Sequence, residues 1–355
     1  CAKVEPMRSP GRVPGALARR LVPLGAVVLV GGLVSACSSG SLATSDLPSL
    51  APRCGAPVAS TSAQRIPFAK ASTGAGPLVV VAVCLDGHGP YPFEVATGMG
   101  TSVVSPTLEH QLGLASAGSG NSAVRGPTCL SSAPTVAVAK LTLGGVALQP
   151  QGMLVAAVPD TGASPAPLGV IGSDVLVRFG AVRFDYAAKR MTVARPESAT
   201  PPANTVVIGQ ANATPPAAFV KSGPTADAVL SVVESPTATL ISVAATFGST
   251  KAQLLVDTGS PRSIVSPSVT AAAGLSSASG SAPASAIGCS GTVKKVSSGT
   301  WSAGSSALPA TTIVTASFTG AGDQGLGGAL GADVLGSYHS FVVDYGGAHL
   351  WLGAG

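Results

Sequence analysis

Two segments of the chain share a pattern of small polar residues, and only one of them holds a carboxylate. Leu254–Ser266 reads LLVDTGSPRSIVS, and Phe93–Ser105 reads FEVATGMGTSVVS. Asp257 follows an apolar run directly, and Ala96 occupies the matching position of the other segment. A carboxylate in such a place can serve as a general acid or base towards a bound molecule. The chain therefore keeps the surrounding pattern twice and the acid once.

The similarity continues along the chain and indicates an internal duplication. Equivalent positions recur at a nearly constant separation of about 160 residues. Val170–Leu176 (VIGSDVL) and Ala329–Leu335 (ALGADVL) are one such pair. We therefore expect a leader over residues 1–36, an anchor and tether over 37–64, a first unit over 65–195, a linker over 196–204 and a second unit over 205–355.

The composition predicts an all-β protein. Val and Thr favour strands, and the 45 glycines and 29 prolines favour turns. Apolar runs such as Leu78–Val83 argue against low-complexity disorder for most of the chain. Within each unit a buried strand is expected to end at the Thr-Gly dipeptide. The pairs Ser105-Pro106 and Ser266-Pro267 predict the starts of two short helices.

These features together resemble a known family. An apolar strand that ends in D-T-G-S, followed far downstream by two apolar residues and a glycine, is similar to the active-site elements of retropepsin-like and pepsin-like aspartic proteases. The downstream element matches Ala329–Gly331 in the second unit and Val170–Gly172 in the first. The resemblance covers both units. It implies two similar retropepsin-like β-barrel lobes, related by a pseudo-two-fold axis, with a cleft between them.

The resemblance also implies a chemistry and assigns roles to residues. In this family two carboxylates share one proton around a water molecule, and like charges so close together split their pKa values. The carboxylate role falls to Asp257. Thr258 would brace the opposite loop, Gly259 would let the backbone approach the carboxylate, and Ser260 would bond its outer oxygen. The supporting positions are Thr97 and Gly98 in the first loop and the downstream glycines Gly172 and Gly331.

Ala96 breaks the family pattern, and two other residues compete for the place of the missing acid. Asp160 begins a second D-T-G, which lies too close in sequence to Gly172 for the active-site position. Glu94 precedes Ala96 by two residues, so on a strand the two side chains point to the same face. For Glu94 we expect a solvated or hydrogen-bonded side chain in preference to a catalytic one.

The first 36 residues belong to targeting and not to the fold. A basic stretch, Met7–Arg20, precedes an apolar stretch, Leu21–Val34, and the residues VSAC follow at Val34–Cys37. This order resembles the bacterial lipobox. It implies lipid attachment to Cys37 and a location on the extracytoplasmic face of the cell membrane. The alternative is a transmembrane anchor, for which the apolar run is rather short.

Charge and cysteine content restrict the remaining possibilities. Much of the formal charge of +5 lies in the leader, and no basic block remains to bind nucleic acid. Four cysteines follow Cys37, and an even number outside the cytoplasm predicts disulfides. The favoured pairing is Cys129–Cys289 with Cys54–Cys84, and Cys84–Cys129 is the rival. No cysteine or histidine spacing suits a metal, so we expect no metal site and no cofactor.

Three functions remain. The first is a surface-anchored aspartic endopeptidase that acts on peptides or proteins and is active as a homodimer if each chain contributes one Asp257. The second is a pseudoprotease that binds peptides or envelope proteins in the cleft without cutting them. The third is a structural lipoprotein. The intact D-T-G-S favours the first function, and Ala96 favours the second.

Overall fold

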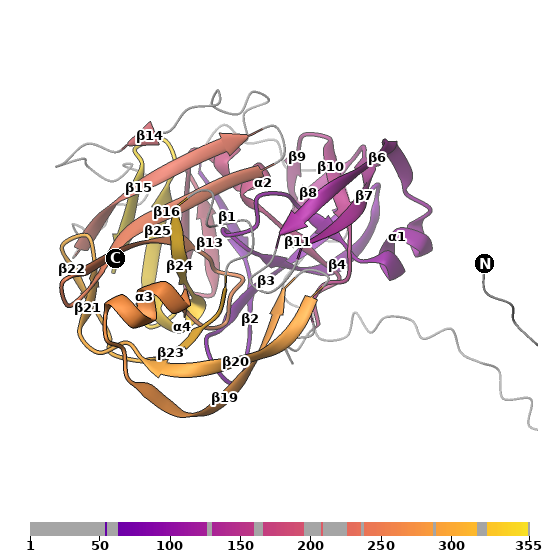
Figure 1. Ribbon diagram of the computed structural model, residues 1–355. Coiled ribbons are helices and arrows are strands. Elements are labelled where there is room, and N and C mark those ends of the chain that lie inside the picture. Colours follow the sequence, from indigo (N-terminus) through magenta and orange to yellow (C-terminus); the bar gives the residue numbers. More distant parts are fainter. Residues whose placement is uncertain are drawn as a thin grey trace, which may run out of the picture. The chain divides into compact units, whose positions relative to one another are not determined.

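The computed structural model describes Cys54 and residues 63–125, 130–159, 166–194, 207–208, 226–235, 238–286, 289–317 and 325–353. These residues form a mostly β structure with a few short helices (Figure 1). The predicted β-rich character of the fold is confirmed. The leader, the linker over 196–204, Cys37, Cys129 and Asp160 lie outside the described residues.

The first half of the described chain forms a ten-stranded sheet. Its strands run in the order β6-β7-β10-β5-β11-β4-β3-β8-β9, and β2 lies beside β3. The bounds are β2 Ala69–Ala71, β3 Leu78–Leu85, β4 His88–Val95, β5 Val103–Val104, β6 Ala115–Arg125, β7 Leu130–Val138, β8 Leu141–Leu143, β9 Val146–Leu148, β10 Gln151–Val155 and β11 Gly169–Ile171.

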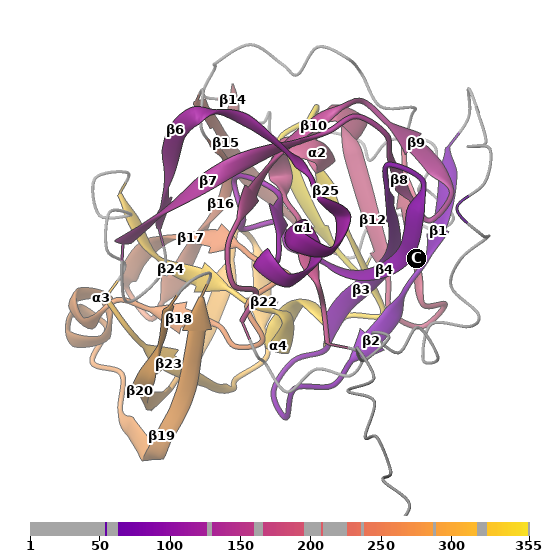
Figure 2. The same ribbon diagram turned by 90° about the vertical axis from the view of Figure 1, so that its right-hand side faces the viewer.

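The second half repeats this strand order inside a larger sheet of 16 strands. The run β16-β17-β24-β18-β23-β20-β19 corresponds to β3-β4-β11-β5-β10-β7-β6, and β21 with β22 corresponds to β8 with β9. The bounds are β16 Ala238–Phe247, β17 Thr250–Val256, β18 Ile264–Val265, β19 Ser277–Ala286, β20 Cys289–Ser297, β21 Trp301–Ala303, β22 Ser306–Leu308, β23 Thr312–Thr315 and β24 Leu326–Leu330. The sequence repeat therefore has a counterpart in topology. The matching hairpins are β19–β20 (orange, Figure 1) and β6–β7 (purple, Figure 2).

The remaining strands join the two halves in one sheet, in the order β1-β13-β12-β25-β26-β15, with β14 beside β15. At its centre β12 pairs with β25, and Phe184 lies opposite Phe341 with ring centroids 4.9 Å apart. The bounds are β1 Gln64–Pro67, β12 Ala181–Asp185, β13 Arg190–Val193, β14 Val207–Ile208, β15 Ala226–Ser235, β25 Ser340–Asp344 and β26 His349–Leu352.

Among the residues that the structure describes, four short α-helices and one 3-10 helix interrupt the strands: α1 Pro106–Leu112, α2 Ser173–Leu176, η2 Val177–Phe179, α3 Pro267–Ala272 and α4 Ala332–Leu335. The predicted helix starts are confirmed. The Ser105 hydroxyl accepts the Leu108 N–H, and the Ser266 hydroxyl accepts the Val269 N–H, each at 3.2 Å. A proline at the first helical position costs nothing there, because that N–H has no partner within the helix. Figure 2 shows α1 and α3. Within the described part of the chain, no helix has the length and apolar character needed to cross a membrane.

The main core draws on alternate residues of β4 and β17. Phe93 and Val95 point into it from β4, and Leu254 and Val256 point into it from β17. Side chains alternate between the two faces of a strand, so Glu94 and Leu255 face the other way. A smaller apolar cluster in each half, separate from the main core, lies on that other face. One contains Ala96, Val103, Ala133, Leu154 and Val170, and the other contains Leu255, Ile264, Ala282, Val293, Val314, Ala316 and Ala329.

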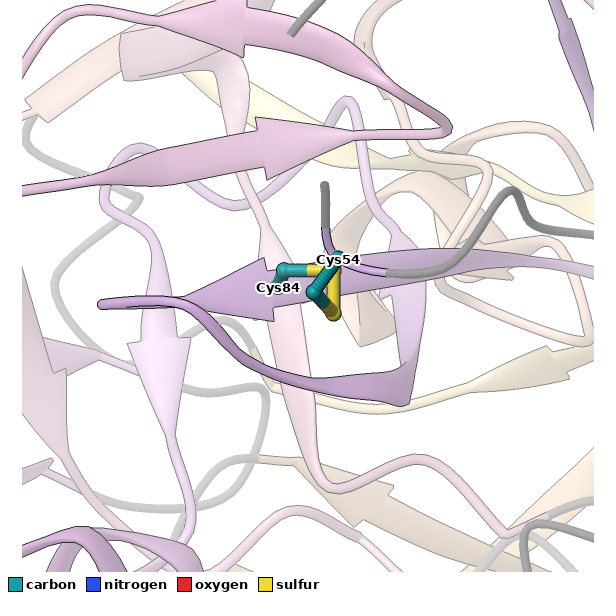
Figure 3. Close-up of a disulfide and its surroundings, with 2 residues drawn as sticks. All are labelled: Cys54 and Cys84. Carbon is teal, nitrogen blue, oxygen red and sulfur yellow. A yellow bond between two sulfur atoms is a disulfide. The ribbon is translucent and has the colours of Figure 1, made fainter. Parts of the chain in front are cut away.

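One disulfide ties the segment before the fold to the first half. Cys54 and Cys84 of β3 are bonded, with Cα atoms 5.8 Å apart (Figure 3). The predicted Cys54–Cys84 pair is confirmed, and the rival Cys84–Cys129 is wrong because Cys84 already has a partner. Cys129 lies outside the described residues. The pair Cys129–Cys289 therefore stays a prediction.

Candidate active site

Two loops meet where strands β4 and β17 end. β4 ends at Val95 and β17 at Val256, and each is followed by one of the two Thr-Gly segments. The backbone N–H of Ala96 donates to Ile171 O and that of Asp257 donates to Leu330 O, at 3.0 Å each. The parallel partners β11 and β24 thus hold both loops in the same way.

The two loops are interlocked by reciprocal hydrogen bonds between Thr97 and Thr258. The Thr97 hydroxyl donates to Val256 O at 2.7 Å, and the Thr258 hydroxyl donates to Val95 O at 2.6 Å. Each hydroxyl also accepts the backbone N–H of the other threonine at 3.1 Å. Both threonines are fully buried. The bracing contact expected of Thr258 is therefore present, and Thr97 returns it.

Asp257 lies at this junction with its carboxylate supported by backbone donors. Its Oδ1 accepts the Gly259 N–H at 2.8 Å. Burial raises the pKa of Asp257, whereas hydrogen bonds from the backbone of Gly259, Gly98 and Ser260 lower it. A Cβ atom on Gly98 would lie 2.7 Å from Asp257 Oδ1, so only glycine lets the opposite loop come this close. Asp257 itself remains half-buried.

The downstream glycines, Gly172 and Gly331, pack closely against these loops. A Cβ atom on Gly172 would lie 2.7 Å from Met99 O, and one on Gly331 would lie 2.6 Å from Arg262 O. The Gly172 N–H donates to Ser102 Oγ at 3.0 Å, and the Gly331 N–H donates to Ser263 Oγ at 2.9 Å. Both positions require close backbone packing.

Two aspartates that the sequence analysis did not single out support the same loops. Asp174 accepts the N–H and the hydroxyl of Ser102 at 2.9 and 2.8 Å. Asp333 accepts the N–H and the hydroxyl of Ser263 at 2.9 and 2.7 Å. Burial raises the pKa of Asp174 to about 6, against the effect of these bonds and of Arg178. The sequence repeat could have identified both aspartates, since each lies two positions after the downstream glycine of its own half.

One expected contact differs in the structure. The Ser260 hydroxyl donates to Arg262 O at 2.7 Å and does not bond the outer oxygen of Asp257. The chain bends at Pro261 and Arg262, and the Ser260 side chain bonds within its own loop. The backbone of Ser260, not its hydroxyl, is the group that stabilises the Asp257 carboxylate.

Glu94 reaches the same junction from the first half. A Cβ atom on Gly259 would lie 2.5 Å from Glu94 Oε1, 2.5 Å from Ala96 Cβ and 3.2 Å from Asp257 Oδ1. Glu94 is only 4 % exposed. No described residue donates a hydrogen bond or a positive charge to its carboxyl group. The expectation of a solvated glutamate is therefore wrong, because the alternation of β4 turns this side chain inward beside Ala96. A hydrogen bond to Glu94 from outside the described residues stays a prediction.

The pKa of Glu94 reflects these surroundings. Burial raises it well above its ordinary value, and the negative charge of Asp257 raises it further. Loss of hydration disfavours the charged carboxylate, and a like charge nearby adds to this effect. The two acids therefore interact electrostatically. In the described part of the chain, no group of three or more His, Cys, Asp or Glu side chains could hold a metal ion.

Comparisons with known proteins give similarities to solved structures alone. No family model matches the chain, and no curated protein matches it. A solved structure, a retropepsin-like aspartic protease from Rickettsia conorii, covers 40% of this chain and 98% of its own, with 14% sequence identity and a TM-score of 0.27. This is a weak likeness to a retropepsin-like fold.

Proposed function

We propose that the chain is an aspartic-type endopeptidase that hydrolyses peptide bonds in peptides or proteins through Asp257. The observation that carries this proposal is the position of Asp257 at two interlocked loops. Its carboxylate accepts the Gly259 N–H at 2.8 Å, and Gly98 of the opposite loop packs against it. Backbone donors stabilise the ionised form, which can take a proton from a water molecule.

The proposed function includes a two-lobed arrangement around this site. The lobes would be related by a pseudo-two-fold axis and would bind the substrate in a cleft between them. The repeated strand order and the reciprocal bonds of Thr97 and Thr258 support this arrangement. The small apolar clusters that contain Ala96 and Leu255 lie on the Asp257 side of their strands. They favour a substrate with apolar side chains near the cleaved bond.

A homodimer that pairs two Asp257 residues has less support than a single-chain site. In such a dimer the Asp257 loop of a second chain would have to lie against the first. The Thr97 loop of the same chain already makes those contacts, and both of its bonded partners are buried. A dimer of that kind would therefore require the two halves of each chain to separate.

A non-cleaving peptide-binding protein is the alternative, and Ala96 is the observation that favours it. Ala96 is 1 % exposed and stands where the family pattern has its second acid. The alternative predicts that peptides bind without being cut and that Asp257→Asn does not change the binding.

Incubation of the purified full-length chain with a mixed peptide library, from acidic to neutral pH, tests the proposal. Mass spectrometry should find new peptide ends with the wild type. The Asp257→Asn variant should lose activity by about a hundredfold to ten thousandfold, the range that a general acid or base contributes. Equal cleavage by both forms would overturn the proposal. Bound but intact peptides would favour the alternative.

We further propose that Cys37 carries lipid and holds the protein on the extracytoplasmic face of the membrane. The order of basic, apolar and VSAC segments in the leader supports this proposal. Acyl chains contribute roughly 0.8 kcal/mol per buried CH₂, so a doubly or triply acylated cysteine would not dissociate measurably. A full-length Cys37→Ala variant should not incorporate labelled fatty acid. If this variant is still cleaved and remains with the membrane, the lipid anchor is wrong.

A further inference from the structure

We propose that Glu94 supplies the second carboxyl group of the site, so that Glu94 and Asp257 of one chain form the catalytic pair. The inference rests on the proposed peptidase function. The family pattern would have its second acid at position 96, where this chain has alanine. Glu94, two positions earlier on β4, would take that role.

The geometry brings the two acids within reach of one water molecule. The point that a Cβ atom on Gly259 would occupy lies 2.5 Å from Glu94 Oε1 and 3.2 Å from Asp257 Oδ1. The two carboxyl oxygens are therefore no further apart than the sum of these distances. Two hydrogen bonds of about 2.8 Å each span such a separation through a single water. The longer side chain of glutamate compensates for its earlier position on β4.

The small side chain of Ala96 and the long side chain of Glu94 approach the same space. Both lie 2.5 Å from the same point above Gly259, Ala96 through its Cβ and Glu94 through its Oε1. An aspartate at position 96 would extend its carboxyl group into the space that the Glu94 carboxyl group approaches. The small side chain of Ala96 leaves that space open. The alanine is thus explained by the acid beside it.

The second half shows what this position holds when no acid is needed. Glu94 lies between Val80 of β3 and Val170 of β11 in the sheet. Its counterpart Leu255 lies between Ser242 and Ala329, and it packs in an apolar cluster. A buried carboxyl group without a partner destabilises a fold, whereas a leucine in the same place stabilises it. Stability therefore does not account for Glu94.

The surroundings of the two acids divide their roles. Backbone N–H groups support the Asp257 carboxylate, and no described residue supports that of Glu94. Asp257 therefore ionises first, while Glu94 is still neutral, and Glu94 must then ionise against the charge of Asp257. The only charged group that faces Glu94 from the strands and loops described around it is Asp257. In the proposed pair Glu94 is therefore the group that holds the shared proton, and Asp257 is the ionised group.

The reaction follows from this division. Asp257 takes a proton from the water as the water oxygen bonds to the peptide carbonyl carbon. Glu94 gives its proton to the carbonyl oxygen, which produces a neutral tetrahedral intermediate. The C–N bond then breaks, the leaving nitrogen takes the proton from Asp257, and one hydroxyl group returns a proton to Glu94. The products are a carboxylic acid and an amine, and the pair is restored.

Peptide cleavage by variants of the full-length chain tests the pair. Glu94→Gln should lower kcat by about a hundredfold to ten thousandfold. Glu109→Gln, which removes a glutamate charge from α1 in the same half, should leave kcat unchanged. Adding Ala96→Asp to Glu94→Leu, which reproduces the Leu255 and Asp257 arrangement of the second half, should restore part of the activity, because it returns a carboxyl group to the opposite loop. The rate per chain should not depend on protein concentration. A rate that rises with concentration would favour the homodimer and overturn the single-chain pair.

A titration separates a catalytic pair from a merely structural glutamate. The carboxyl carbon of Glu94, followed by ¹³C NMR against pH, should titrate at lower pH in Asp257→Asn than in the wild type. Glu94→Leu, which installs the residue of the second half, should keep the circular dichroism of the folded chain and lose activity. An unshifted Glu94 titration, or full activity of Glu94→Gln with an inactive Asp257→Asn, overturns the role of Glu94 and leaves the peptidase proposal standing. Full activity of Asp257→Asn overturns both, as does a wild type that cleaves nothing.

Discussion

The loop after β4 and the loop after β17 make the same hydrogen bonds with different acids. Thr97 and Thr258 each donate to the last carbonyl of the opposite strand, and each accepts the other's N–H. At the first loop position the residues are Ala96 and Asp257. Two positions earlier they are Glu94 and Leu255. Each half therefore contributes one acid, but from a different position. The two halves therefore share the hydrogen bonds of the loops and differ in where they carry an acid.

Breaking the threonine interlock should have the largest effect on stability. Thr97→Val leaves Val256 O and the Thr258 N–H without partners in a buried place, and Thr258→Val leaves the equivalent groups. An unsatisfied buried group costs about 1–3 kcal/mol, so each variant should lose about 2–5 kcal/mol of unfolding free energy. Chemical denaturation measures this loss. Thr97→Ser and Thr258→Ser keep the hydroxyl and serve as controls. Clearly unequal losses for the two valine variants would show that the loops are not equivalent.

The disulfide is the next difference between the halves. Cys84 on β3 is bonded to Cys54, and Thr246 has the corresponding position on β16. The bond closes a loop with a sequence separation of 30 residues. Replacing both cysteines by alanine should lower the free energy of unfolding by about 2–4 kcal/mol. Thermal denaturation without reductant measures this. A further loss when the variant is reduced would report the predicted Cys129–Cys289 bond.

Exchanging Glu94 for the leucine of the second half should change stability with pH. The pKa of Glu94 is raised in the folded state, so the unfolded state loses its proton at lower pH. Glu94 therefore costs no stability below the unfolded pKa of about 4.3, and its contribution becomes destabilising as pH rises towards the folded pKa. Glu94→Leu should remove this dependence and be more stable than the wild type at pH 7 by about 1–3 kcal/mol. A stability gain that is the same at pH 4 and pH 7 would contradict it.

The sequence predicted the scaffold of the site better than its acids. The repeat offset and the Ser-Pro and Thr-Gly dipeptides are local signals, and they located the helix starts and the strand ends. The approach of Gly98 to Asp257 and of Glu94 to Gly259 depends on how two distant segments pack. That information is not present in either segment alone. The burial of Glu94 was missed for this reason. Strand alternation predicts which face of the sheet a side chain lies on, but it does not predict which residues cover that face.

The smallest effect that tests the comparison concerns the two helix starts. The Ser105 and Ser266 hydroxyls each accept one backbone N–H at 3.2 Å. Replacing either serine by alanine removes an N-cap, which costs about 1 kcal/mol. The two losses should be similar, since α1 and α3 begin with the same Ser-Pro pair. Ser105→Asp and Ser266→Asp, which retain a capping oxygen, should recover most of the loss in chemical denaturation.

Neither helix start contacts the acids, so peptide cleavage should not change. A loss of activity in only one alanine variant would mean that its helix helps to position the site, and the two halves would then differ in support as well as in acid placement.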